Sequence, residues 1–140
     1  MIRYTDTTEG LTPERLRGFF VGWPSPPSPE THLDILRGSH RVVLALDDET
    51  GAVIGFVNAI SDGVLAAYVP LLEVLPEYRG RGIGRELVTR MQEALGGFYM
   101  VDLLCDTDME GFYSRFGMKP GRAMMLRRYD RQSGIPPQDR

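Results

Sequence analysis

The sequence predicts an α/β fold in which helices pack against one mixed β-sheet. Segments with hydrophobic residues at helical spacing interleave along the chain with segments of continuous or alternating apolar character. The length of 140 residues suits one hydrophobic core, and 42% hydrophobic with 25% charged residues is typical of a globular protein. We therefore expect one domain over residues 1–130 and a flexible tail over residues 131–140.

A first strand near Ile2 is expected to precede two helices. Residues 12–14 supply an N-cap threonine, a first-turn proline and an acidic residue, as at the start of a helix. The apolar positions that follow at helical spacing are Leu16, Phe19 and Phe20. Residues 28–30 repeat the starting pattern, and that second helix is expected to end near Gly38. Four prolines in residues 23–30 predict a stiff, extended loop between the helices.

The middle of the chain is predicted to form a meander of strands. Residues 41–46 and 52–60 are rich in β-forming residues, and the turn residues at 47–51 join them into a hairpin. A long apolar run over residues 64–75 predicts the next strand. Pro70 interrupts this run and cannot donate to a β-ladder, so we expect a bulge or a lost neighbour there.

The C-terminal half is predicted to alternate helix and strand. Apolar residues at helical spacing indicate a helix over residues 83–95. Residues 99–105 have the pattern of a buried strand that ends with the single cysteine, Cys105, which we expect to be packed. Asp106 is expected to cap a short helix, and a last strand is expected over residues 122–129.

Composition argues against several classes of partner. A net charge of −3 disfavours a nucleic-acid partner, and two scattered histidines are too few for a metal cluster. No apolar run approaches the roughly 20 residues that a membrane span needs, and the N-terminus lacks the apolar segment of a signal peptide. We therefore expect a cytoplasmic protein without a metal, a membrane contact or a nucleic-acid partner.

Residues 79–84 carry the most informative pattern in the chain. Glycines at positions 80, 82 and 84 follow a strand and lead directly into a helix. Glycine allows successive backbone N–H groups to point into one concavity, and the start of a helix adds unpaired N–H groups. Arg79, Arg81 and Arg85 add positive charge. The pattern predicts a binding site for a phosphate group.

Two other phosphate-binding motifs do not fit this segment. A Walker loop needs a Gly-Lys-Ser/Thr triplet, which the sequence lacks. A dinucleotide-binding fingerprint needs a third glycine where Leu87 stands. Asp102 has the spacing of that fold's ribose-binding acid, but too few residues follow it to complete the fold.

The same segment resembles the GNAT N-acetyltransferases, because residues 79–84 match their R/Q-x-x-G-x-G/A signature. Residues 112–120, FYSRFGMKP, are similar to the tyrosine-bearing helix of that family and the glycine after it. The order of elements agrees over residues 2–129. The resemblance implies a mixed, mostly antiparallel sheet of six or seven strands flanked by about four helices, with the fourth and fifth strands splayed apart.

The resemblance also implies acetyl-CoA as the co-substrate and assigns residues to it by position. The pantetheine arm would lie between the splayed strands and pair with the backbone of Leu72, Glu73 and Val74. The diphosphate would lie on a loop that comprises Arg79, Gly80, Arg81, Gly82, Ile83 and Gly84, with Arg85 beside it. Many relatives carry an asparagine that donates to the pantetheine where this chain has Asp106, and an ionised carboxylate cannot donate. Asp106 is therefore expected to act as a helix cap.

Acetyl transfer to an amine needs a neutral amine and a proton donor for the departing thiolate. The resemblance assigns the general acid to Tyr113. Glu73 and Asp102 are both candidates for the base, and the sequence leaves the choice open. The expected reaction is direct attack by the primary amine of a small-molecule acceptor in a ternary complex. The alternative is a catalytically inactive protein that binds CoA or acetyl-CoA as a sensor or partner subunit.

The acceptor is expected near the first two helices and the centre of the sheet. Candidate acceptor residues are Phe20, Trp23, Asp62 and Tyr68, of which Asp62 would meet a cationic amine. Dimers are common in the family that the chain resembles. The sequence therefore leaves a homodimer open, with the C-terminal strand as its edge.

Overall fold

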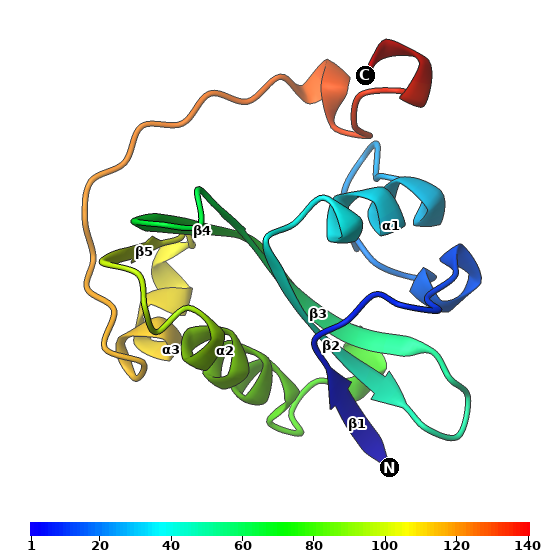
Figure 1. Cartoon of the computed structure of the whole chain (residues 1–140), viewed down its shortest axis with the longest axis horizontal. Coiled ribbons are helices and arrows are strands. Elements are labelled where there is room, and N and C mark those ends of the chain that lie inside the picture. Colours follow the sequence, from blue (N-terminus) through cyan, green and yellow to red (C-terminus); the bar gives the residue numbers. More distant parts are fainter.

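A mixed sheet of five strands forms the centre of the computed structural model, which describes residues 1–140 (Figure 1). The strands lie in the order in which they occur in the chain: β1 (Ile2–Thr5), β2 (Arg41–Asp47), β3 (Val53–Ser61), β4 (Ala66–Val74) and β5 (Met100–Asp102). Neighbours from β1 to β4 are antiparallel, whereas β5 is parallel to β4. Helix α1 (Pro29–Arg37) lies on one side of the sheet, and α2 (Ile83–Ala94) lies on the other with α3 (Glu110–Ser114) beside it (Figure 1).

The two central strands are buried almost throughout because helices cover both of their faces. Six of the seven residues of β2 and seven of the nine of β3 are buried. Gly55 lets α2 approach β3 closely, since a Cβ atom there would lie 3.2 Å from Leu87 and 3.3 Å from Ile83. No helix of the structure has the length and apolar character that crossing a membrane requires.

Helix α1 begins and ends where the sequence predicts. The hydroxyl of Ser28 accepts a hydrogen bond from the amide of Thr31 at 3.1 Å, and Pro29 occupies the first turn. The helix ends at Arg37, and Gly38 follows as its C-cap.

The prediction of a helix after Thr12 is wrong beyond the first turn. Only a short 3₁₀ helix forms, over Pro13–Leu16. Gly18 then adopts a φ of 91°, and Phe20 a φ of 62°, the single positive value at a residue other than glycine. A left-handed backbone cannot continue a right-handed helix. The chain over residues 18–22 is therefore a loop.

The last expected strand, residues 122–129, does not form, so the sheet has five strands rather than the expected six or seven. The structure has three α-helices rather than the expected four or so. Residues 119–127, here called the C-terminal arm, make no backbone hydrogen bond. Figure 1 shows this segment in orange, passing from the α3 end of the molecule to the α1 side. No strand covers the outer edge of β5, and Cys105 is exposed rather than packed, contrary to expectation.

The tail after the arm contains two short 3₁₀ helices, Tyr129–Arg131 and Pro137–Asp139. It lies against the α1 side of the molecule, where Arg140 pairs with Asp34 at 2.7 Å. The division at residue 130 and the flexibility of residues 131–140 stay predictions.

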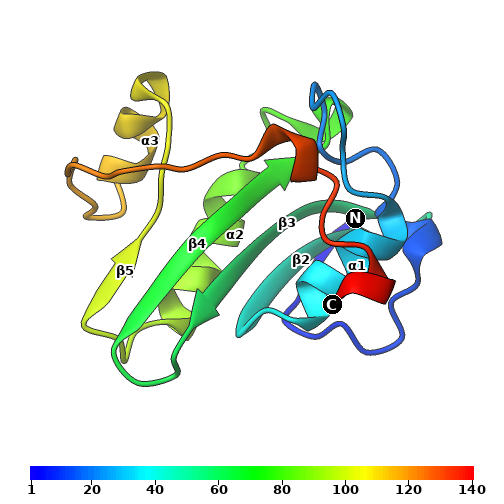
Figure 2. The same ribbon diagram turned by 90° about the horizontal axis from the view of Figure 1, so that it is seen from above.

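Pro70 lies at an irregularity of β4, as expected. Between the pairs Asn58–Leu71 and Ile60–Tyr68, β3 advances by two residues and β4 by three, so β4 bulges. Pairing of β4 with β5 ends at Tyr68, two residues before the proline. Figure 2 shows the chain rising away from β4 after β5, towards α3. The edge of β4 beyond Pro70 is thus open, as the predicted splay requires.

His32 on α1 is an uncharged polar group inside the core. Its ring packs against three aromatic rings, with centroids 4.4 Å from Phe56, 4.9 Å from Phe20 and 5.3 Å from Phe19. Neither ring nitrogen has a hydrogen-bond partner. Burial lowers the pKa of His32 from 6.5 to about 4, because this apolar site disfavours the imidazolium ion.

Acidification is therefore expected to destabilise the protein through His32. Below pH 6.5 the unfolded chain binds a proton that the folded chain excludes, so stability falls until the pH reaches about 4. A shift of this size corresponds to roughly 3 kcal/mol of unfolding free energy. Urea unfolding of the wild type and of His32→Leu, each at neutral and mildly acidic pH, measures the effect. Equal losses in the two proteins would contradict it.

Candidate active site

Six consecutive backbone amides lie unpaired where β4 leads into α2. Gly80 and Gly82 have φ values of 80° and 79°, and this left-handed conformation turns the chain into the helix. None of the amides of residues 80–85 donates a backbone hydrogen bond, and no side chain caps α2 at Gly82. Free N–H groups at a helix start bind anions well. The structure thus leaves the predicted phosphate loop with open donors.

A cleft of about 720 Å³ connects this loop to the open edge of β4. It contains every residue predicted to bind the coenzyme except Arg81, and adds Tyr78, Met109 and Phe112: the shared lining residues are Leu72, Glu73, Val74, Arg79, Gly80, Gly82, Ile83, Gly84 and Arg85. Met109 and Phe112 were not identified from the sequence, although their position at the start of the tyrosine-bearing helix and within it was a usable signal. One continuous cleft therefore joins the two predicted halves of the coenzyme site.

The three arginines of the loop differ in their freedom to meet a phosphate. Arg79 donates from Nε to the carbonyl of Val74 at 3.0 Å. Arg81 lies over the ring of Tyr78 at 5.2 Å and outside the cleft. The side chain of Arg85 has no hydrogen bond or ion pair, and it is exposed at the cleft. Arg85 is therefore the arginine most available to an anion.

Tyr78 fixes the base of the loop to the sheet. Its hydroxyl donates to the carboxylate of Asp47, at the end of β2, at 2.8 Å. This hydrogen bond lowers the pKa of Asp47 and raises the pKa of Tyr78, because it stabilises the carboxylate and holds the phenol proton.

The open edge of β4 offers backbone groups in alternation. The amide of Leu75 donates to the carbonyl of Ile54 on β3 at 2.9 Å. Since alternate residues of a strand direct their backbone groups to opposite edges, those of Glu73 point to β3 and those of Leu72 and Val74 to the open edge. Leu72 and Val74 are thus the residues placed to pair with an extended ligand.

The carboxylate of Glu73 holds the loop that replaces the first expected helix. It accepts hydrogen bonds from the amides of Phe20, at 2.8 Å, and Val21, at 3.2 Å. The partners lie more than 50 residues apart in sequence, so no local pattern indicated this contact. It explains how Phe20 is kept in its left-handed conformation, and it occupies both oxygens of one candidate base.

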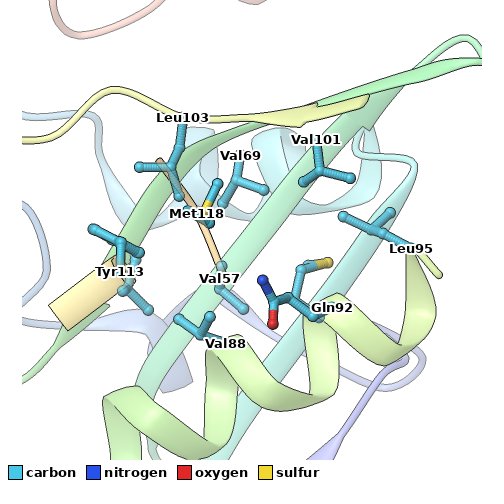
Figure 3. A pocket seen from close by; sticks show the side chains of 11 residues that line it. Val57, Val69, Val88, Gln92, Leu95, Val101, Leu103, Tyr113 and Met118 are labelled. Carbon is cyan, nitrogen blue, oxygen red and sulfur yellow. The ribbon is translucent and has the colours of Figure 1, made fainter. Parts of the chain in front are cut away.

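Tyr113 lies beside the splay, on the α2 side of the sheet. Figure 3 shows its ring reaching from α3 into a small apolar cavity of about 20 Å³, whose other lining residues include Val57, Leu72, Val88, Val101, Leu103 and Met118. Burial raises the pKa of the Tyr113 hydroxyl, and the neighbouring Cys105 adds to the rise. The phenol therefore holds its proton firmly at neutral pH.

Asp102 lies on the opposite face of β5 from the Tyr113 cavity. Its neighbours in the chain, Val101 and Leu103, line that cavity and also an adjoining cleft of about 930 Å³, whereas Asp102 and Tyr68 line only the adjoining cleft. Asp102 and Tyr68 are paired in register between β5 and β4. The Asp102 carboxylate accepts no hydrogen bond and is exposed. Of the two candidate bases, it is the one without a partner.

The predicted acceptor residues do not all come together. Phe20 is buried and packs against the half-exposed Trp23, with ring centroids 4.9 Å apart. Tyr68 lies in the other cleft, with Asp102. Asp62 lies in the turn between β3 and β4, where Oδ1 accepts bonds from the amides of residues 64, 65 and 66, and these bonds lower its pKa. The Asp62 carboxylate is therefore already hydrogen-bonded within its own turn.

Asp106 occupies the expected capping position without making the expected contact. It is the N-cap residue of a 3₁₀ helix over Thr107–Met109, but its side chain makes no capping hydrogen bond. Its backbone carbonyl accepts from the amide of Met109 at 2.9 Å instead.

Comparison with known proteins identifies one family. The family model described as the acetyltransferase (GNAT) family matches residues 8–118. A proposed acetyltransferase from Deinococcus radiodurans R1 is similar in structure, with a TM-score of 0.93 and 55% identity over 96% of this chain and 94% of that chain. An acetyltransferase of the GNAT family from Streptococcus pneumoniae TIGR4 has a TM-score of 0.71 and 27% identity over 91% of this chain and 100% of that chain.

A proposed acetyltransferase of Gibberella zeae is also similar in sequence. The two are 34% identical over 85 residues, which is 59% of this chain and 45% of that protein. This match therefore spans less than half the length of the fungal protein.

Proposed function

Because the chain belongs to the acetyltransferase (GNAT) family, we propose that it transfers the acetyl group of acetyl-CoA to the primary amine of a small-molecule acceptor. The amine would attack the thioester directly while both substrates are bound. The single observation that carries the proposal is the cleft of about 720 Å³ that joins six unpaired amides to the open edge of β4. A diphosphate and an extended amide-bearing arm fit these two parts in turn.

The residues proposed to bind acetyl-CoA follow from this arrangement. Amides of residues 80–85 would hold the diphosphate, and the free guanidinium of Arg85 would add charge. The backbone of Leu72 and Val74 would pair with the pantetheine amides at the open edge. This would leave the thioester near Leu72, which lines both the cleft and the Tyr113 cavity.

Tyr113 is proposed to protonate the departing thiolate. Its pKa is raised by burial, so the phenol is a proton donor over the whole neutral range. When the tetrahedral intermediate collapses, the carbon–sulfur bond breaks and the phenol proton passes to sulfur, which avoids release of a free thiolate. Placement of both substrates in one site supplies a further large share of the acceleration.

Asp102 is proposed to accept the proton of the acceptor ammonium, directly or through water. Its free carboxylate lies on the face of β5 opposite the Tyr113 cavity, so an amine would enter from the side away from the acid. Glu73 is proposed to position the loop of Phe20 and Val21 instead, because both of its oxygens already accept amides.

Substitutions at the two carboxylates are expected to have different effects. Asp102→Asn should lower kcat by about 10²-fold or more, the usual contribution of a general base, with unchanged thermal stability. Glu73→Gln should lower stability and raise the acceptor KM, because its amide nitrogen would face a backbone N–H that needs an acceptor. Asp6→Asn, an exposed carboxylate outside the site, is the control. An unchanged kcat in Asp102→Asn would reject this base.

The proposed function is tested by following CoA release over a panel of amines that includes amino acids, amino sugars, polyamines and aminoglycosides. Turnover with one class supports the enzyme and identifies the acceptor. Tight binding of acetyl-CoA in calorimetry with no turnover on any amine would instead support the alternative, an inactive coenzyme-binding sensor or partner subunit. No heat with acetyl-CoA would overturn both.

A further inference from the structure

A pocket of about 250 Å³ is formed by the loop that precedes α1 and by α1 itself. No charged side chain lines it. Its ring-bearing walls and its two polar side chains are Phe19, Phe20, Pro26, Pro27, Ser28 and His32. A cavity of about 150 Å³ is enough to hold a benzene molecule. This pocket, here called the His32 pocket, therefore has room for a substituted aromatic ring.

His32 is the polar side chain of this pocket that makes no hydrogen bond. The hydroxyl of Ser28 already accepts from the amide of Thr31 and donates to its hydroxyl. His32 is only 1% exposed, and neither Nδ1 nor Nε2 has a partner. A buried polar group without a partner lowers stability, and a leucine of similar size would avoid that loss. A ligand in the pocket would supply the missing partner.

The imidazole of His32 is suited to a hydroxyl group as that partner. The lowered pKa of His32 keeps the ring neutral, and a neutral imidazole donates from one nitrogen and accepts at the other. A hydroxyl both donates and accepts, so it matches either nitrogen, whereas a carboxylate only accepts and an ammonium only donates. The uncharged lining also offers no counter-ion to a charged group. The pocket thus favours an uncharged ring that carries a hydroxyl.

The His32 pocket adjoins the strand that is proposed to bind the coenzyme. The ring centroid of Phe56 on β3 lies 4.4 Å from that of His32, and Phe56 is paired in register with Glu73 on β4. The carboxylate of Glu73 accepts from the amide of Phe20, a wall residue of the pocket, at 2.8 Å. Glu73 also lines the coenzyme cleft. One residue therefore contacts the wall of the pocket and lines the coenzyme cleft.

We propose that the His32 pocket binds a hydroxyl-bearing aromatic ring of the acceptor, with the hydroxyl bonded to the imidazole. The acceptor would then be a primary amine attached to a phenol-like ring. This inference rests on the proposed function, since it takes the ligand of the pocket to be the acceptor. His32 would determine specificity, because a site that hydrogen-bonds a hydroxyl discriminates against an analogue that lacks it and leaves the site unpaired.

Nitrogen NMR of the imidazole rings tests the pocket without acetyl transfer. The chain has two histidines, and His40→Leu identifies the signals of His32. His40 packs against Phe98, outside the pocket. Millimolar 4-methylphenol, a phenol without an amine, is expected to shift the nitrogen signals of His32 and to leave those of His40 in place. Signals of His32 that 4-methylphenol does not move, or that toluene moves equally, would overturn the proposal.

Two amines that differ by one hydroxyl test the pocket during acetyl transfer. Tyramine is expected to exceed phenethylamine in kcat/KM by about 10-fold or more in the wild type. In His32→Leu the ratio should fall to about twofold or less, because leucine fills the same space without a hydrogen-bonding nitrogen. This variant removes a buried unpaired polar group and should therefore fold. His40→Leu is the matched control and should keep the wild-type ratio.

The kinetic outcomes separate this inference from the proposed function. An equal kcat/KM for the two amines in the wild type, or an unchanged preference in His32→Leu, would overturn the role of His32. Turnover of other amines but not of tyramine would also overturn it and would leave the proposed function in place. No turnover with any amine would reject the proposed function and, with it, the identification of the ligand as an acceptor.

Discussion

Tyr113→Phe is expected to lower kcat by about 10²–10⁴-fold, the usual contribution of a positioned general acid. Phenylalanine keeps the ring in its apolar cavity and removes only the hydroxyl, so the proton donor is lost with little change in packing. The affinity for acetyl-CoA should change little, because Tyr113 is outside the lining of the coenzyme cleft. The loss should thus fall on kcat rather than on the KM for acetyl-CoA.

Steady-state kinetics with the acceptor identified by the amine panel measure this effect, and calorimetry measures coenzyme affinity separately. Tyr129→Phe is the matched control, since Tyr129 is 72% exposed and lines neither the Tyr113 cavity nor the cleft of Asp102. A kcat for Tyr113→Phe within twofold of the wild type would remove Tyr113 from the mechanism.

Gly82→Val is expected to weaken acetyl-CoA binding by about 10–100-fold. Gly82 has a φ of 79°, a conformation that costs a β-branched residue about 1–3 kcal/mol. The loop would relax by rotating that residue, and the amides of residues 80–85 would no longer point together. Nothing lies within 4 Å of an added Cβ atom, so the change should act through backbone conformation rather than through a clash.

Gly10→Val separates this effect from general strain. Gly10 also has a positive φ, 76°, with nothing within 4 Å of an added Cβ, but it lies outside the cleft. Both variants should lose similar stability in thermal unfolding, and only Gly82→Val should lose coenzyme affinity in calorimetry. Equal coenzyme affinities in Gly82→Val and the wild type would show that the loop does not hold the diphosphate.

Local signals in the sequence predicted those parts of the fold that local physics determines. Ser28 caps α1 as expected, because capping involves atoms only three residues apart. Pro70 marked the bulge of β4, since a missing N–H restricts a strand wherever the residue lies. The glycine loop was also located from a local signal, because glycine adopts the left-handed conformation of Gly80 and Gly82 readily.

The errors occurred where distant parts of the chain determine the structure. The pattern after Thr12 is helical, but Glu73 binds the amides of Phe20 and Val21 and stabilises a loop instead. Residues 122–129 have the composition of a strand, yet a strand needs a partner, and none lies beside it in a single copy. The side of the sheet on which Asp102 lies depends on strand register, which no local pattern specified.

The hydrogen bonds from Phe20 and Val21 to Glu73 would couple the binding of the two substrates. The carboxylate belongs to the strand that would bind the coenzyme, and the amides belong to a segment that packs around Trp23. Coenzyme bound at the edge of β4 would also restrict the motion of that segment. The acceptor would then bind to a segment that is already ordered. Thermodynamic linkage makes such cooperation reciprocal, and calorimetric titration of each substrate with and without the other would reveal it.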